Sequence, residues 1–489
     1  MNSRVIIWAL AFTLAACASA AHAQAPDQNS QSQDPAFANP TPSTPPQSRE
    51  ARTLPAAAAR GVSEPDDLQP YDPANVTPDV NTLAGAQLFG VGSLGSSRNI
   101  FDPSLSVSEL GQTFPSAPGQ SSLYSTTLVG GALDFDRTWS RYHTIAVYSG
   151  GEDFVRGFQN LNAQFHDASI SQEVDWARLH LVLRDDFIAT PGASFTGTGI
   201  GGPGIITQIA STLESSLNGI GMGFIPGETI ENGTVMRYMN AALGQAEYSF
   251  SRRSVLTVAG SYGLLHFTTP GFVDSHMLNT QAGYDYMLDP FDSIGFIAGY
   301  GKISFVGTSG ATSNYLGALA FGRKITGRLA FQVGGGPEQI RSTSAANGGF
   351  QTWYASVTTA LTYERRRDGY SLTFTRGLTS GSGVLLGAKS NIFTVGAHRD
   401  LTRHWTTSVN GGYAINNSLT TVNGSSQRFD NWFIAATLGS QLGRHALLNF
   451  SYGLQRQYSP PVCPVTSCGV SGYQQSFGMT LNWHLRPNE

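Results

Sequence analysis

The sequence has 489 residues, of which only 13% are charged and 56 are glycine, and its formal net charge at pH 7 is −4. Soluble domains usually carry about 25% charged residues, so this composition argues against a set of ordinary soluble domains. Nucleic-acid binding needs a basic surface, which the mildly acidic charge does not provide. After residue 23 no apolar run approaches the about 20 residues of a membrane-spanning helix.

Residues 1–23 have the pattern of an export signal peptide. Arg4 precedes an apolar core, and Ala21-His22-Ala23 forms a small-x-small cleavage site. A second pattern, Leu14-Ala15-Ala16-Cys17, resembles a lipobox, in which Cys17 would be lipidated. We favour cleavage after Ala23, and both alternatives carry the protein out of the cytoplasm.

Residues 24–100 follow as a segment rich in Pro, Gln and Ser, and eleven of the 24 prolines of the chain lie between residues 24 and 80. Such a composition cannot bury enough apolar surface to offset the entropy of ordering the chain. We therefore predict a disordered periplasmic tail without a folded domain of its own.

From residue 101 onward, apolar and polar residues alternate in runs long enough to cross a bilayer as tilted strands, which takes about 9–11 residues. The last run, Tyr473 to Leu485, is the clearest, because Gln474, Ser476, Thr480 and Asn482 occupy the opposite face. Its apolar face is formed by Tyr473, Phe477, Met479, Leu481, Trp483 and Leu485. Period-two alternation of this kind predicts a transmembrane β-barrel, with one face toward lipid and the other toward the lumen.

The strands can be counted from this alternation. Five runs precede a long insertion, namely residues 101–110, 123–135, 142–149, 162–172 and 178–188, and about thirteen lie between Ala241 and Leu485. The total predicts an antiparallel up-and-down barrel of about 18 strands, with 16 as the alternative. Short basic turns such as residues 251–254 and 400–404 alternate with longer loops such as 307–313 and 334–350, which is typical of short periplasmic turns and long external loops.

With this architecture the chain resembles the porin-like barrels of Gram-negative outer membranes over residues 101–489. The resemblance rests on the alternating aromatic C-terminal strand, which such barrels present to the barrel-assembly machinery. Here Arg486-Pro487-Asn488-Glu489 follow Leu485, whereas the family usually ends on an aromatic residue. The resemblance implies a location in the outer membrane, contact with its lipid, and passage of small hydrophilic solutes. It leaves the oligomeric state open, with a trimer as one candidate.

The insertion at residues 189–239 would be the third external loop, which in such porins folds inward and narrows the channel. Apolar residues between Ile205 and Ile220 recur at helical spacing. Glu214, Glu228 and Glu231 could then line an acidic constriction. The alternative is an external cap that takes no part in selecting solutes.

Other motifs indicate no catalytic or cofactor chemistry. Cys463 and Cys468 lie in the last long loop of an exported protein, which predicts a disulfide. Residues 197–202 spell G-x-G-x-x-G but have no preceding buried strand, so we expect no dinucleotide site, no cofactor and no metal.

An enzymatic barrel would need a nucleophile and a base in contact. Two groups of residues are candidates for such a catalytic pair. His404, Ser408 and Asn410 lie on one strand, and His266, Asp274 and His276 lie around one loop. Along a strand, His404 and Ser408 are about 13 Å apart, and a solvated loop histidine is seldom a catalyst, so we predict no enzyme. The expected function is a passive channel for small hydrophilic solutes. The alternative is a structural or secretion-associated surface barrel without pore activity.

Overall fold

The computed structural model describes residues 100–117, 120–156, 163–191, 230, 235–307, 310–343, 349–381, 383–422, 425–460 and 472–485. All of them belong to one structural unit, Ala58–Glu489. Residues 1–23, expected to be removed, and residues 24–99 of the segment 24–100 expected to be disordered lie outside the described residues, whereas Ile100 begins the first strand.

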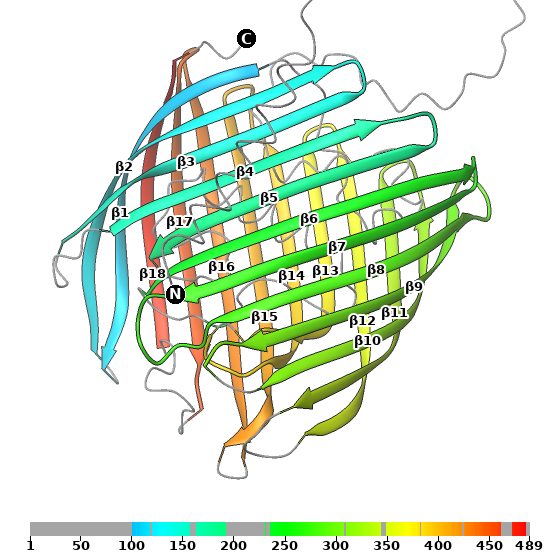
Figure 1. Ribbon diagram of the computed structural model, residues 1–489. Coiled ribbons are helices and arrows are strands. Elements are labelled where there is room, and N and C mark those ends of the chain that lie inside the picture. Colours follow the sequence, from blue (N-terminus) through cyan, green and yellow to red (C-terminus); the bar gives the residue numbers. More distant parts are fainter. Residues whose placement is uncertain are drawn as a thin grey trace, which may run out of the picture. The chain divides into compact units, whose positions relative to one another are not determined.

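The described chain forms 18 strands and closes into a barrel (Figure 1). In chain order they are β1 Ile100–Ala117, β2 Gln120–Trp139, β3 Tyr142–Arg156, β4 Ala163–Asp175, β5 Leu179–Pro191, β6 Met236–Ser251, β7 Ser254–Phe267, β8 Ser275–Met287, β9 Asp292–Phe305, β10 Ala311–Lys324, β11 Leu329–Thr343, β12 Phe350–Arg365, β13 Asp368–Thr379, β14 Ala388–Asp400, β15 Trp405–Val422, β16 Ser425–Leu442, β17 Ala446–Tyr458 and β18 Gly472–His484. The predicted count of 18 is confirmed, and the alternative of 16 is wrong.

Each strand pairs antiparallel with its neighbours in sequence, and β1 closes the ring by pairing with both β2 and β18. Closure matters because it leaves no open sheet edge between the first and the last strand. None of the described residues forms a helix long and apolar enough to cross a membrane.

The two ends of the barrel differ in their connections. At the end that we call the turn end, strands are joined by two to four residues, such as 140–141, 252–253 and 325–328. The last two lie where the sequence predicted short turns. At the other end, the loop end, the connections vary more in length. The loop expected at 334–350 is mostly strand, because β11 continues to Thr343 and pairs with β10 and β12 along the way. Glycine and serine there lower the apolar signal, but β11 stays paired with β12 throughout, and only its ladder with β10 skips Gly336 and Pro337.

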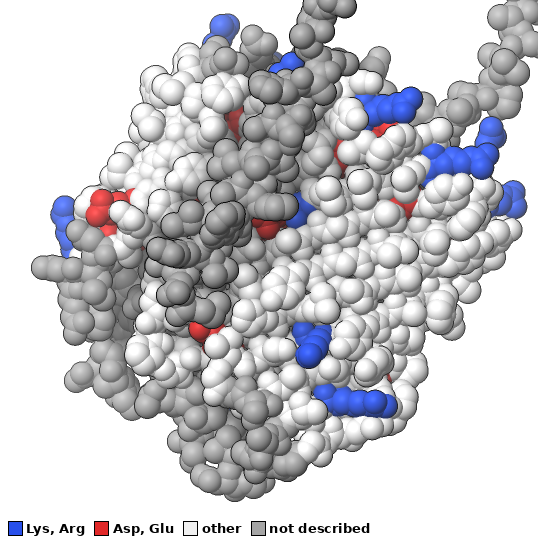
Figure 2. All heavy atoms as spheres, in the orientation of Figure 1, with Lys and Arg blue, Asp and Glu red and all other residues white. Residues whose placement is uncertain are grey.

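The alternation of faces is confirmed on β18. Trp483 and Phe477 are 49% and 60% exposed on the outer face, whereas Asn482 and Gln474 are buried on the inner face. Figure 2 shows the outer face of the front strands, which is mostly free of charged residues, with Lys and Arg toward its margins. An apolar outer face and a polar inner face are the arrangement of a transmembrane barrel.

Several carboxylates depart from this pattern on the outer face, and Glu109 and Asp185 are two of them. Glu109 of β1 accepts a hydrogen bond from Thr127 Oγ1 at 2.6 Å, and Asp185 of β5 accepts one from Asn240 Nδ2 at 3.1 Å. Each is therefore paired with a neighbouring strand, which lowers the cost of placing it outside the lumen.

Candidate functional site

Charge is distributed unevenly around the inner wall. Strands β2 to β5 turn several acidic side chains inward, among them Asp136, Asp153 and Asp167. By contrast, the described inner-facing positions of β15, β16 and β17 carry only uncharged residues, such as Asn431 and Gln455. The inner wall therefore has an acidic arc and a neutral polar arc.

Histidine–carboxylate pairs lie on the acidic arc near the turn end. His143 Nε2 lies 2.8 Å from Asp136 Oδ1, and its Nδ1 lies 3.4 Å from Glu173 Oε2. Two more pairs lie on adjacent strands: His180 Nδ1 with Asp175 Oδ1, and His484 Nδ1 with Asp102 Oδ2, both at 2.7 Å. We call these seven residues the histidine belt, and it runs from β18 through β1 to β5.

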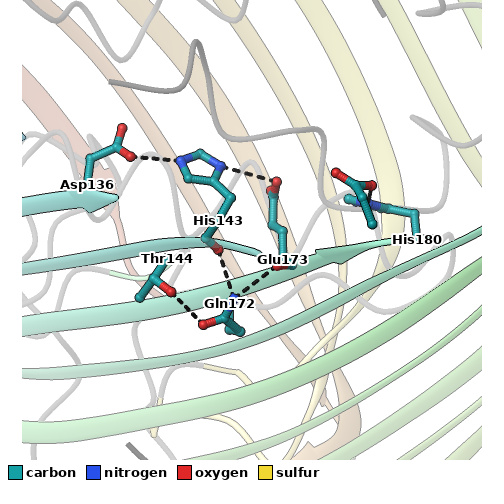
Figure 3. A network of polar contacts seen from close by, with 7 residues as sticks. Asp136, His143, Thr144, Gln172, Glu173 and His180 are labelled. Atoms are coloured by element: carbon teal, nitrogen blue, oxygen red, sulfur yellow. Dashed lines mark hydrogen bonds and ion pairs between the residues drawn. The ribbon is translucent and has the colours of Figure 1, made fainter. Parts of the chain in front are cut away.

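The central member of the belt is held by its backbone as well as by its ring (Figure 3). On the opposite side of the strands, Gln172 Nε2 donates to the carbonyl oxygens of His143 and Glu173 at 3.2 and 3.0 Å. Thr144 Oγ1 donates to Gln172 Oε1 and fixes that amide. Only a protonated imidazole donates from both nitrogens, so this geometry fits an imidazolium that bridges the two carboxylates.

Further along the wall, toward the loop end, lies a second group of charges. Arg184 Nε contacts both oxygens of Asp186, at 2.9 and 2.8 Å, and both side chains are buried. Asp167 on the adjacent strand is 1% exposed, and neither of its oxygens has a hydrogen-bond donor among the described residues. This inner wall therefore holds a buried carboxylate to which no described residue donates a hydrogen bond.

Near the loop end, the β13–β14 hairpin separates from β12, while the start of β14 stays paired with β15. The ladder between β12 and β13 begins at the pair Val357 and Arg376 and ends at the pair Arg365 and Asp368. The part of β12 nearer the loop end, residues 350–356, therefore pairs with β11 alone. We call the diverging segment, residues 376–390, the lumen arm; residue 382 is the one position of it that is not described.

The lumen arm packs against inner-facing side chains of other strands. Leu378 is fully buried against Ile303, Phe305 and Ile340 of β9 and β11. Leu385 belongs to a second buried cluster with Val384, Ala388, Ile230 and Phe429. The arm therefore lies inside the barrel, with an apolar surface where a loop would otherwise project outward.

The contacts of the arm reach opposite sides of the barrel. The carbonyl of Gly383 accepts a hydrogen bond from the amide of Val273, in the β7–β8 connection, at 2.9 Å. Phe429 lies on β16, nine strands away from β7 in a ring of 18. Because nine strands are half of the ring, the lumen arm spans the opening.

Glycine makes this path possible. Gly381, Gly383 and Gly387 have φ angles of +82°, +71° and +82°, a region that other residues adopt only with strain. A Cβ atom on Gly383 would also lie 2.2 Å from the Phe267 ring. The arm therefore needs these glycines both for its turns and for its close approach to the wall.

The base of the arm carries two cations. The Arg376 guanidinium and the Lys389 ammonium lie 4.6 and 5.3 Å from the centre of the Tyr354 ring of β12. Next to them, the buried Glu338 accepts a hydrogen bond from Asn314 Nδ2 at 2.7 Å. Cation–π contacts stabilise by about 0.5–2 kcal/mol each, so they add to the apolar packing that holds the arm against the wall.

The structure tests only part of the predicted site. The acidic residues Glu214, Glu228 and Glu231, and the pair Cys463 and Cys468, lie outside the described residues, so the constriction and the disulfide remain predictions. Within residues 192–234 the one described residue is Ile230, which packs against the lumen arm. The six residues expected to form the assembly strand all lie on the outer face of β18 and at its end.

The two candidate catalytic groups are not assembled. His266 Nδ1 and Asp274 Oδ2 are 2.6 Å apart, but His276 Nδ1 contacts Tyr262 Oη at 3.2 Å instead. The Ser408 hydroxyl is bonded to Thr437 Oγ1 at 2.6 Å, while His404 lies in the turn before β15. Among the described residues there is also no group of three or more His, Cys, Asp or Glu side chains that could hold a metal ion.

The lumen arm was missed by sequence reasoning, which expected the third loop to enter the lumen. A signal was present: residues 380–387 combine three glycines with Val384, Leu385 and Leu386, whereas an exposed loop usually lacks such an apolar run. The sequence also indicates the acidic arc, because Asp153, Asp167 and Asp186 occupy polar positions in strands where apolar and polar residues alternate.

Comparison with known proteins finds neither a matching family model nor a matching curated protein. Solved structures similar to this chain include OpdQ of Pseudomonas aeruginosa, with 8% identity and a TM-score of 0.38, over 79% of this chain and 98% of that one. OccK2 (OpdF) of the same organism, solved with glucuronate, has 8% identity and a TM-score of 0.41, with 79% and 98% covered. OccAB3 of Acinetobacter baumannii has 9% identity and a TM-score of 0.38, with 79% and 99% covered. At these values the similarity identifies no solute and no site residue.

Proposed function

We propose that this protein is an outer-membrane channel through which small hydrophilic solutes diffuse passively. The observation that carries the proposal is the closed ring of 18 strands with an apolar outer face and a polar inner face. Barrels with 16–18 strands enclose an aqueous channel unless something fills it. Transport through such a lumen depends on its width and lining, and it requires no covalent chemistry.

The lumen arm narrows this channel. The buried side chains of Leu378 and Leu385 hold the arm inside the loop end, and the space that the arm occupies reduces the width on which passage depends. We therefore propose a selective channel that conducts less than an unobstructed barrel of the same size, independently of the constriction predicted in residues 189–239.

The proposal includes a cellular setting. With the predicted export signal, residues 1–23, we propose that residues 24–100 lie in the periplasm as a tail that leads into the barrel. The barrel-assembly machinery would recognise the outer face of β18, which would then contact outer-membrane lipid.

Electrical recording tests the channel directly. We expect the purified protein, folded in detergent and inserted into a planar bilayer, to give discrete current steps in potassium chloride. We also expect liposomes that contain it to swell in a small sugar faster than in a larger one. Folded protein that gives no current and no swelling would refute a solute channel.

A second candidate is a structural or secretion-associated barrel without pore activity. The arm favours it, because a segment that spans the lumen can close it. The two functions separate when the arm is loosened by Leu385→Ala. A regulated or selective channel then conducts more, whereas a barrel filled for structural reasons stays silent with or without this change.

A further inference from the structure

We propose that the inner faces of β3, β4 and β5 form a binding track for small organic cations that carry an ammonium or guanidinium group, with Asp167 as its central site. The proposal rests on the channel function and adds the class of solute. It concerns the acidic arc alone and does not depend on the undescribed insertion.

The central observation is that the buried carboxylate of Asp167 lacks a hydrogen-bond donor among the described residues. Its side chain is 1% exposed, and both of its oxygens lack a donor among the described residues. Its cross-strand neighbour Ser149 is also buried, with a hydroxyl that has no partner in the described part of the chain. The nearby Arg184 is held by Asp186 and does not bond to Asp167. A buried carboxylate is costly to keep charged without a partner, and a cation from the lumen supplies one.

Carboxylates continue from this site in both directions. Asp153 lies toward the loop end of β3 and has one oxygen without a described donor, and Glu173 of the histidine belt lies toward the turn end of β4. With Asp167 and Asp186 they make four carboxylates against two cations, the Arg184 guanidinium and the His143 imidazolium, which leaves two negative charges. The four carboxylates lie on three adjacent strands, β3, β4 and β5, and follow the inner wall from the loop end to the turn end.

The chemistry of the track selects the occupant. Its unpaired groups are oxygens, which accept hydrogen bonds, so a partner with several N–H donors satisfies more of them than a bare ion does. Charge-assisted bonds to carboxylates are the strongest of this type. Anions are repelled by the acidic arc, and the neutral arc of β15 to β17 provides no compensating cation. Because Asp167 has little exposed surface, a narrow ammonium or guanidinium group fits it better than a bulky hydrated ion.

Bilayer recording of the full mature chain can test the track. In a potassium chloride gradient we expect cations to permeate more readily than anions, and Asp167→Asn to lower that permeability ratio about threefold to tenfold. Arginine hydrochloride should cause transient current blocks in the unaltered protein. In Asp167→Asn the blocks should be about tenfold shorter, because a charge-assisted hydrogen bond has been lost. Sodium glutamate should block neither protein.

A matched control removes the same charge elsewhere. Glu109→Gln neutralises a carboxylate on the outer face, and it should leave both the permeability ratio and the arginine blocks unchanged. Asp153→Asn repeats the test at a second position of the track and covers the case in which Asp167→Asn fails to fold.

The outcomes distinguish the two proposals. A folded protein without any conductance refutes the channel function itself. A conducting protein whose cation preference and arginine blocks are the same with and without Asp167 refutes the track. Blocks by magnesium chloride but not by arginine would also overturn it, because they would assign the site to metal ions.

Discussion

The lumen arm predicts a change in conductance when one side chain is shortened. Leu385 is 1% exposed and packs with Ile230, Val384 and Phe429, and it lies between β13 and β14 outside the strand ladders. Leu385→Ala removes buried methyl groups and leaves a cavity, which costs about 2–5 kcal/mol in well-packed sites. This loss lowers the stability of the docked arm but not that of the strand ladders. At about 3 kcal/mol, the fraction of undocked arms rises about a hundredfold.

The assay is single-channel recording, with larger or more frequent open steps as the expected result for Leu385→Ala. Leu319→Ala is the matched control, because Leu319 is 62% exposed on the outer face of β10. It deletes the same atoms without touching the arm and should leave the current unchanged. Equal currents in Leu385→Ala and the unaltered protein would mean that the arm does not limit conduction.

Three further changes test other parts of the structure. Met479→Lys places a charge on the outer face near the middle of β18 and should lower the free energy of unfolding in lipid vesicles by about 2–4 kcal/mol. Thr480→Lys on the inner face should cost clearly less, and equal losses in urea titrations would contradict the assignment of faces. Gly383→Ala should raise conductance as Leu385→Ala does, because the arm has no room for the added Cβ, while Gly443→Ala, with a similar φ of +74° but no atom within 4 Å, should not. His143→Ala leaves the two carboxylates it bridges without a shared donor, and we expect a loss of about 1–3 kcal/mol in urea unfolding followed by tryptophan fluorescence; an unchanged midpoint would mean that the histidine belt does not stabilise the wall.

Strand number and facing could be predicted because they depend on local alternation. Trp483 and Asn482 differ in polarity, and adjacent residues of a strand point to opposite faces whatever lies around them. The short turns were predicted for a similar reason, since Arg252 and Arg253 interrupt the alternation where a chain reverses. The length of β11 was less predictable, because the polar and glycine-rich end of that strand is held by pairing with β10 and β12 and not by its own composition.

The sequence predicts which residues face the lumen, but it does not predict which of them contact one another. That Asp167 faces inward follows from its strand, but its lack of a donor depends on Arg184 being bonded to Asp186 on the next strand. The bridge from His143 to Asp136 and Glu173 likewise requires the register of three strands. Register is set by pairing between segments, and a single strand does not contain that information.

The sequence by itself determined that this chain forms a barrel sheet with one apolar and one polar face, because period-two alternation recurs in runs long enough to cross a bilayer, in a chain with few charges. Only the tertiary structure decided what occupies the lumen. Residues 376–390 read as the end of one strand, a loop and the start of the next, and they turn inward because Leu378 and Leu385 find apolar partners on strands far away in the sequence. Such contacts depend on the curvature of the whole ring, which brings β7 and β16 to opposite sides of one opening.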